Sequence, residues 1–431
     1  MASPDSTASG GPVTEWPGPR YHRPVSDPIP PPAPTTIAPA PTTIAPTPRH
    51  DVPPHSNVPR QRRGSTGTRK GAAPPVLVEM RRGATVESRH RGHVVMVAAS
   101  GEVIRAVGSP ATEVLMRSTI KPLGLVALIE SGAADAFGLV PAELAVMAGS
   151  HTGEDRHVRT LQAIFRRASV TQVLLTCGID GAPGDARTAA RLARDGEKPG
   201  PLRHDCSGYH AASILMSVHA GWSLEDYADP THKSQLEIRD AVARLLRRKL
   251  GTLKPATDDC GMATYEVTLV ELARAYLLLA HPESAAADDR VARSAPALRR
   301  IRDAMMSAPD MVGGTDDVLD TELMRRRPQV LVSKSGAEGL RGIGLVAGPD
   351  ARGAVPAGLA IKIEDGDASR RASRAVAVEA LAQAGVLDDR DLRALASYHH
   401  PASSAPDGRE VATAVPRFEL APMSELTGAK A

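Results

Sequence analysis

A serine and a lysine stand three residues apart in the stretch from Arg117 to Pro122, which reads R-S-T-I-K-P. Residues i and i+3 share one face of a helix, so an amine at Lys121 could reach the hydroxyl of Ser118. A neutral amine there could take the serine proton and turn a weak nucleophile into a strong one. The pair therefore predicts the chemistry of a serine hydrolase.

The residues after this pair distinguish it from a chance spacing on a solvated helix face. The run from Leu123 to Ile129 is apolar nearly all round and stops at Ser131-Gly132, as a helix buried on most sides should. Burial disfavours the ammonium form of a lysine. We therefore expect Lys121 to be available as a base near neutral pH.

The first part of the chain has a composition unlike the rest. Nineteen of the 37 prolines lie before Val76, and A-P-T-T-I-A-P occurs twice in tandem over residues 33–46. Such a segment cannot bury enough apolar surface to offset its ordering entropy. We predict a disordered proline-rich tail over residues 1–75 and a folded domain of two lobes over residues 76–425.

Composition also limits the partners and the compartment. The sequence shows neither the apolar core of a signal peptide nor a run of about 20 apolar residues, so we expect a cytoplasmic protein with no membrane partner. A net charge of +3 and an aromatic content of 3% argue against nucleic-acid binding. The three cysteines favour free thiols or metal ligands over a disulfide framework.

Hydrophobic periodicity predicts an α+β chain. A hairpin of strands is expected over residues 94–97 and 103–107, and further strands near the end of the chain. Between them the apolar residues recur with the period of a helix, and we expect helices at 156–168, 210–220, 236–250 and 267–280. Strands at 329–334, 342–347 and 358–363 and a helix at 369–384 are expected after them. We predict one antiparallel sheet formed from N- and C-terminal strands with an inserted helical lobe, and a site between them where the Ser118 helix faces the Lys334 strand.

A second motif stands at the end of one late strand. Lys334-Ser335-Gly336 matches in kind the K-T-G that accompanies S-x-x-K in class A β-lactamases and penicillin-binding proteins. With the motifs around it, the chain resembles the zinc-associated bacterial L-asparaginases of the Rhizobium type, the asparaginase II family, over Val86 to about Pro401. These proteins are similar in fold to serine β-lactamases. The motifs that carry the resemblance are R-S-x-x-K-P at 117–122, S-H-T-G-E-D-R-H at 150–157, D-C-S-G-Y-H at 205–210, T-D-D-C at 257–260, K-S-G-A-E-G at 334–339, K-I-E-D-G at 362–366 and Y-H-H-P at 398–401.

The resemblance implies a β-lactamase/transpeptidase-like fold and an amidohydrolase that converts L-asparagine to L-aspartate and ammonia. Its two Ser-Lys pairs would be Ser118 with Lys121 and Ser150 with Lys334. One serine would form an acyl-enzyme while its lysine moves the proton, and we rank Ser118 first. A homodimer is also implied. The substrate-binding residues carried over are Arg117, His151, His210 and Asp258.

Some positions depart from the family pattern. The family binds a metal through Cys-Ser-Gly-Lys and a distant cysteine, whereas this chain has Tyr209 at the lysine position, so Cys206, Cys260 and Tyr209 are the candidate zinc ligands. Asp259 replaces a glycine beside Asp258. These changes keep two alternatives open: a serine acyl hydrolase nearer the glutaminases or β-lactamases, and a catalytically weakened binding paralogue.

Overall fold

The computed structural model describes residues 73–285, 288–346 and 355–422, and most of the predicted tail lies outside them. The strands are β1 (Val76–Arg82), β2 (Thr85–Ala98), β3 (Val103–Val107), β4 (Glu113–Leu115), β5 (Pro255–Thr257), β6 (Ala263–Thr268), β7 (Leu331–Gly336), β8 (Leu340–Leu345), β9 (Ala357–Ile363), β10 (Ala402–Ser404), β11 (Glu410–Pro416) and β12 (Ala421–Pro422). The α-helices are α1 (Lys121–Glu130), α2 (Ala133–Ala136), α3 (Pro141–Ala148), α4 (Asp155–Arg167), α5 (Ala186–Asp195), α6 (Ser207–Ala220), α7 (Lys233–Leu245), α8 (Leu269–Ala280), α9 (Asp289–Ala292), α10 (Ala295–Ser307), α11 (Pro309–Val312), α12 (Leu319–Arg326), α13 (Ala372–Gln383), α14 (Asp389–Ala394) and α15 (Ala396–His399). Short 3₁₀ helices are η1 (Arg117–Ile120), η2 (Gln172–Leu174), η3 (Pro201–Arg203) and η4 (Pro282–Ala285).

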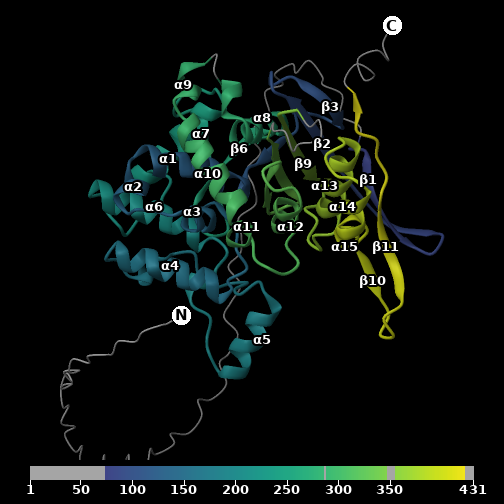
Figure 1. The fold of residues 1–431 in the computed structure, drawn as a ribbon, viewed down its shortest axis with the longest axis horizontal. Helices are drawn as coiled ribbons and strands as arrows, with labels where there is room; N and C mark the ends of the chain where they lie inside the picture. Colours follow the sequence, from purple (N-terminus) through teal and green to yellow (C-terminus); the bar gives the residue numbers. More distant parts are fainter. Residues whose placement is uncertain (1–72, 286–287, 347–354, 423–431) are drawn as a thin grey trace, which may run out of the picture. The chain divides into compact units, whose positions relative to one another are not determined.

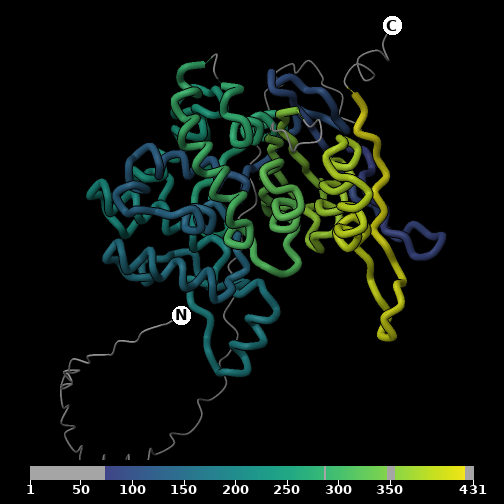
Figure 2. Tube along the Cα trace, in the orientation of Figure 1, coloured from purple at the N-terminus to yellow at the C-terminus, as the bar shows by residue number. Residues whose placement is uncertain are grey.

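The main sheet joins the two ends of the described chain. Its antiparallel order is β10-β11-β1-β2-β9-β8-β7, with β3 also paired to β2 and β12 to β3. The register places Val78 opposite Pro416 and Val94 opposite Ile361. Figure 2 shows the early and late segments running side by side. A smaller sheet has the order β4-β6-β5.

Helices cover the central strands of the main sheet. Helix α8 packs against β9, β8 and β2, while α13 packs against β9, β1 and β11 (Figure 1). Strand β8 is buried at every position. The close approach of α8 needs Gly358, because a Cβ there would lie 1.9 Å from the carbonyl oxygen of Ala273. The helical lobe therefore packs on the sheet through α8.

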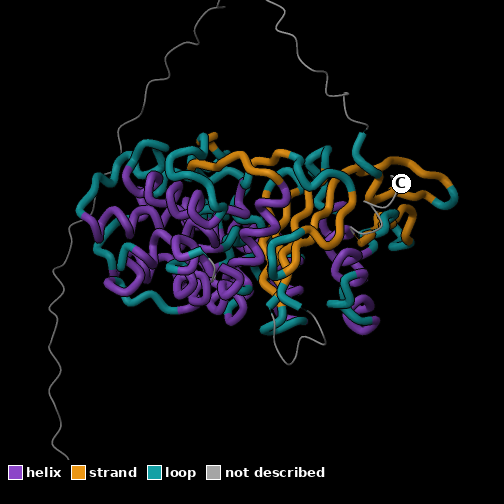
Figure 3. The backbone as a smooth tube through the Cα atoms, turned by 90° about the horizontal axis from the view of Figure 1, so that it is seen from above, coloured by secondary structure: helices purple, strands orange, loops and turns teal. Residues whose placement is uncertain are grey.

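The helical lobe is formed by the chain between β4 and β7. Most helices gather on one side of the strands (Figure 3). Helix α1 is buried from Lys121 to Leu128, and each fully buried leucine contributes roughly 1.5–3 kcal/mol by leaving water. Helix α6 approaches α3 closely at Gly208, where a Cβ would lie 2.2 Å from the carbonyl oxygen of Val146. None of the helices in the described ranges is both long and apolar enough to cross a bilayer.

The α+β architecture, with a sheet built from both ends and an inserted helical lobe, is confirmed. The predicted helices correspond to α4, α6, α7, α8 and α13, and the late strands to β7, β8 and β9. The sequence analysis missed the C-terminal strands β10 to β12, which complete the sheet beyond β1 and β3. Ser118 and Lys121 were expected at the start of a helix; Ser118 lies in η1, a 3₁₀ helix that leads directly into α1 at Lys121.

Candidate active site

A cavity of about 470 Å³ holds both predicted serines. Ser118 and Ser150 reach it from the helical lobe, and Ser335 and Glu338 reach it from β7 and the turn that follows. Asp205 also lines it. The location between the helical lobe and the sheet agrees with the predicted position of the site.

The backbone at Ser118 makes a sharp turn. Arg117 has φ of 46°, a left-handed conformation that costs a non-glycine residue roughly 1–3 kcal/mol and that clusters at functional sites. The Arg117 N–H donates to Thr264 Oγ1 at 2.8 Å, which fixes the turn to β6. This turn directs Ser118 to the cavity while Lys121 starts the next helix.

Lys121 makes contacts that its spacing from Ser118 did not predict. Its Nζ donates to Ser150 Oγ at 2.8 Å, to Cys206 Sγ at 3.2 Å and to the Asp205 carbonyl oxygen at 3.3 Å. Ser150 itself follows α3 and is fixed through its N–H, which donates to the Val312 carbonyl oxygen at 2.8 Å. The resemblance paired Lys121 with Ser118, whereas the hydrogen bond in the structure joins Lys121 to Ser150, the serine of the other pair.

The charge of Lys121 also differs from the expectation. Its side chain is buried, and burial alone would lower its pKa, but the negative charges of Cys206 and Asp205 outweigh burial and raise the pKa above its ordinary value. Lys121 is thus an ammonium at neutral pH. The expectation of a neutral base at this position is corrected, because anions from a segment 84 and 85 residues away lie beside it.

Lys334 lies in a different network on β7. Its Nζ donates to the Ser335 carbonyl oxygen at 2.6 Å. Beside it, the buried carboxylate of Asp320 on α12 accepts hydrogen bonds from Ser333 Oγ (2.6 Å), from the Ser335 N–H (2.8 Å) and hydroxyl (2.7 Å), and from Arg341. The Arg341 and Lys334 charges hold the pKa of Asp320 at about 2 although burial would raise it.

Lys334 is the lysine whose proton is weakly held. Burial lowers its pKa to about 8, since the raising effect of Asp320 is smaller and the charge of Lys121 adds to the lowering. Strand β7 packs against η1, and the Ser118 turn is held there by Tyr276, whose hydroxyl donates to the Thr119 carbonyl oxygen at 2.9 Å. The site therefore combines one fixed cation with one lysine that is partly neutral near pH 8.

The predicted substrate-binding residues lie in three places. His151 lines the cavity, with Nε2 3.0 Å from Ser207 Oγ, and burial lowers its pKa well below the ordinary value. His210 is fully buried on α6, 2.7 Å from the Tyr227 hydroxyl. Arg117 binds Asp258 through an Nε to Oδ1 contact of 2.7 Å. Of these four, only His151 lines the cavity directly.

The three cysteines are free and buried, as the sequence analysis expected of free thiols. A hydrogen bond from Cys260 and the Lys121 charge lower the pKa of Cys206, and Cys260 keeps its own proton. His204, Asp205 and Cys206 offer donor atoms within 4.8 Å of one another.

Tyr209 fits poorly as a zinc ligand. Its hydroxyl has no hydrogen-bond partner among the described residues, packs against Gly124 of α1, and has a pKa raised well above the ordinary value by burial. A phenolate ligand would need the opposite shift. The Lys121 ammonium already provides a cation at Cys206. The soft donors that remain from the predicted set are Cys206 and Cys260.

Sequence reasoning missed Asp320 and Arg341, which surround the Lys334 strand. Both are buried, with 3% and 4% of their surface exposed. A buried charge is rare unless paired, yet the pairing between α12 and β8 joins positions 21 residues apart with no shared motif. Asp320 lies in the first turn of α12, where acidic residues are common. Its sequence position therefore does not indicate a buried ion pair.

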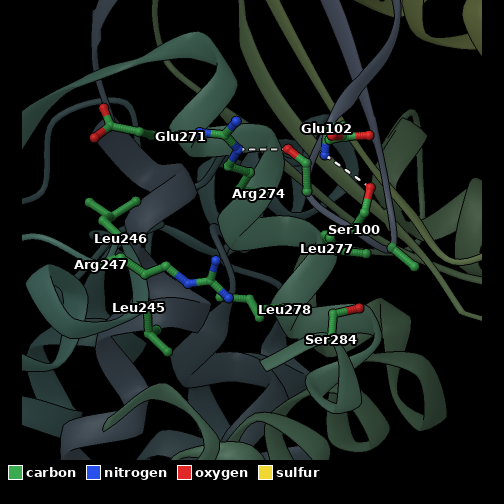
Figure 4. A pocket seen from close by; sticks show the side chains of 12 residues that line it. Ser100, Glu102, Leu245, Leu246, Arg247, Glu271, Arg274, Leu277, Leu278 and Ser284 are labelled. Atoms are coloured by element: carbon green, nitrogen blue, oxygen red, sulfur yellow. Dashed lines mark hydrogen bonds between the residues drawn. The ribbon is translucent and has the colours of Figure 1, made fainter. Parts of the chain in front are cut away.

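A second cavity, of about 330 Å³, lies over α7, α8 and the turn between β2 and β3. Figure 4 shows its leucines together with Arg247, Arg274 and Glu271, and the bond from Arg274 Nε to the Gly101 carbonyl oxygen at 2.8 Å. Its serines are Ser100 and Ser284. Among the described residues no lysine donates to either of them, whereas Lys121 donates to Ser150 in the first cavity.

Comparison with known proteins places the chain. Curated proteins give no significant match. Among solved structures, a probable glutaminase from Bacillus subtilis complexed with 6-diazo-5-oxo-L-norleucine is 12% identical with a TM-score of 0.34, over 68% of this chain and 84% of that one. A Bacillus glutaminase in 4.3 M NaCl is also 12% identical, with a TM-score of 0.33, over 68% of this chain and 91% of that one. The model of the family described as L-asparaginase II matches residues 78–416, so this chain belongs to the L-asparaginase II family.

Proposed function

We propose that the protein is an amidohydrolase that releases ammonia from the side-chain amide of L-asparagine or a closely related amide, through an acyl-enzyme on Ser118. Family membership supports amide hydrolysis. The observation that carries the proposal is a cavity lined by Ser118 and Ser150 with two buried lysines behind its lining. Lys121, which is charged, donates to Ser150, and Lys334, with a pKa of about 8, precedes the lining residue Ser335 in β7. When their surroundings give two lysines different pKa values, the lysine with the lower pKa can act as the base and the other remains a cation.

Ser118 is the better nucleophile of the two serines. The Ser150 oxygen accepts a hydrogen bond from the Lys121 ammonium, which draws electron density away from that oxygen. Ser118 lies in η1 against β7, the strand that carries Lys334. An amine with a pKa near the working pH is the most effective general base. We therefore assign attack to Ser118 and proton removal to Lys334.

The proposed steps conserve every proton. The Ser118 oxygen bonds to the amide carbon while neutral Lys334 takes the hydroxyl proton; the carbon–nitrogen bond then breaks, and Lys334 gives that proton to the departing ammonia. Water attacks the ester, loses a proton to Lys334, and the proton returns to Ser118. Lys121 stays protonated throughout and orients the Ser150 hydroxyl, whose own hydrogen is free to donate to the substrate.

Ammonia release from asparagine, glutamine and β-aspartyl amides tests the proposal. The wild-type protein is expected to act on at least one of them, and Ser118→Ala to lose that activity. Mass spectrometry of the quenched reaction should find the acyl adduct on the peptide that contains Ser118. Full activity in Ser118→Ala together with its loss in Ser150→Ala would reverse the assignment of the nucleophile. Absence of ammonia from the whole panel would refute the proposed function.

A further inference from the structure

Two carboxylates hold the guanidinium of Arg117. Its Nε lies 2.7 Å from Asp258 Oδ1, and its Nη2 lies 2.5 Å from Asp259 Oδ2. The Arg117 and Asp258 side chains are 13% and 12% exposed, whereas that of Asp259 is 90% exposed. Asp259 is therefore an exposed carboxylate on an arginine that is otherwise enclosed.

This arrangement occupies the Nε–Nη2 edge of Arg117 with two carboxylates. A guanidinium recognises a carboxylate through two parallel N–H groups on one edge. Here Asp258 and Asp259 each take a donor, and the three side chains together carry one net negative charge. A substrate carboxylate that approached Arg117 would have to displace Asp259 and would meet repulsion from it.

The three side chains lie next to the proposed nucleophile. Arg117 immediately precedes Ser118, which lines the cavity. The Arg117 charge also reaches Lys362, whose pKa is lowered by burial and by that charge. Lys362 Nζ in turn donates to the carbonyl oxygen of Glu338, another cavity residue. Arg117 is not itself a lining residue, but its backbone joins Ser118 and its charge reaches the lysine that donates to Glu338.

Three arginines of the described ranges line the cavity itself, Arg341, Arg370 and Arg374. Arg341 is buried and paired with Asp320, and Arg374 contacts Asp317 at 2.9 Å. Within the described part of the lining, Arg370 is the arginine for which no ion pair is found, and it is exposed to solvent. Arg117, which precedes Ser118 in the chain, and Arg370 are therefore the two arginines to test as partners of a substrate carboxylate.

We propose that Asp259 sets the substrate class of this site by occupying Arg117, so that the preferred substrates are amides whose α-carboxyl group is blocked, as in a peptide-linked asparagine. The inference rests on the proposed function. It predicts that the free amino acid, with its α-carboxylate, is a poor substrate relative to a neutral derivative. Removing the Asp259 charge should open one edge of Arg117 to that carboxylate.

The test compares L-asparagine with its α-N-methylamide, in which the side-chain amide is the source of ammonia. In the wild-type protein, kcat/KM for L-asparagine is expected to be no higher than that for the methylamide. In Asp259→Asn the ratio of the two kcat/KM values should rise about tenfold in favour of L-asparagine, as the loss of one close repulsive charge allows.

A matched control is available in Asp135→Asn. Asp135 is also exposed, at 74%, and also lies 2.5 Å from an arginine, Arg300, but it does not line the cavity. This control should leave the ratio unchanged. A wild-type preference for L-asparagine of more than tenfold, or an unchanged ratio in Asp259→Asn, would overturn the inference. Loss of that preference in Arg370→Ala would then identify the residue that binds the carboxylate.

Binding measurements distinguish a failure of this inference from a failure of the proposed function, because they need no turnover. Calorimetry with the products, L-aspartate and L-aspartate α-N-methylamide, gives the same comparison without turnover. If no ammonia is released but the methylamide binds more tightly than L-aspartate and Asp259→Asn reverses that order, the function fails and the inference stands. Absence of binding by either product would overturn the inference.

Discussion

Lys121 and Lys334 are both buried, with 2% and 1% of their surface exposed, yet their surroundings push their charges in opposite directions. Lys121 faces Cys206 and Asp205, whose negative charges raise its pKa. Lys334 faces Asp320, but that carboxylate is already paired with Arg341, and the pKa of Lys334 falls to about 8. Burial alone does not decide the charge of a lysine; the unneutralised charge of its neighbours does.

The largest effect is expected from removing the proposed base. Lys334→Met should lower kcat/KM for the best amide at pH 7.5 by about 10³-fold, in the range expected for a lost general base. In the wild-type protein, kcat/KM should rise with pH up to about 8, since only neutral Lys334 can accept a proton. The exposed Lys249→Met is the control and should be active. A variant that keeps a tenth of the wild-type rate would show that Lys334 is not the base.

Loss of the fixed cation should cost less. Lys121→Met removes the ammonium that orients Ser150, and we expect a decrease of about 10²-fold in kcat/KM, as for one lost electrostatic donor. The rise of activity towards pH 8 should persist, because Lys334 is still present. The pH profiles of the two variants distinguish the roles, and disappearance of that rise in Lys121→Met would mean that the roles are exchanged.

The charge of Asp320 affects the pH at which Lys334 loses its proton, and so the pH dependence of activity. Its carboxylate raises the pKa of Lys334 against the effect of burial, so Asp320→Asn should move the rise of kcat/KM to lower pH by about one unit. Ser333→Ala removes a hydrogen bond to Asp320 without removing a charge and should leave the profile in place. A shift to higher pH in Asp320→Asn would contradict the account.

The smallest effect concerns stability. Because the pKa of Lys334 is lowered to about 8 from an ordinary 10.5, the unfolded chain binds more protons between these values, and this lysine makes the wild-type protein more stable as pH rises through that window. Lys334→Met should raise the free energy of unfolding at pH 7 by about 1–2 kcal/mol.

For Lys121 the sign is reversed. Its raised pKa gives stability that is fully present below 10.5 and is lost as pH rises through the folded value. Lys121→Met should therefore lower the free energy of unfolding at pH 7. Urea unfolding of both variants at pH 7 and pH 10 measures the contrast, and the same sign of change in both at pH 7 would refute it.

The order of elements was largely predictable from the sequence, because apolar periodicity located the strands around residue 360 and the helices of the inserted lobe. The cavity was predictable only in part: of the predicted site residues, Ser118, Ser150 and His151 line it. Their functional roles stay predictions. What local patterns could not give is the pairing, because Lys121 meets Ser150 and Cys206 through turns and helix packing that join positions 29 and 85 residues away.

The protonation states of the two lysines could not be predicted from the sequence for the same reason. From the sequence, Lys121 was expected to be neutral because its helix is apolar. The anions that reverse this expectation, Asp205 and Cys206, lie 84 and 85 residues further along the chain. Asp320, which offsets part of the burial of Lys334, comes from a helix with no motif. Charge at a buried group is a property of tertiary neighbours, which spacing along the chain does not reveal.

The most direct test is a titration of lysine side chains labelled with ¹³C at Cε, followed by NMR and assigned with Lys334→Met and Lys121→Met. The account predicts that the Lys334 signal titrates near pH 8 while the Lys121 signal stays that of an ammonium up to pH 10. A Lys334 signal that remains charged at pH 10, or a Lys121 signal that titrates below pH 9, would contradict the division of roles between the two lysines.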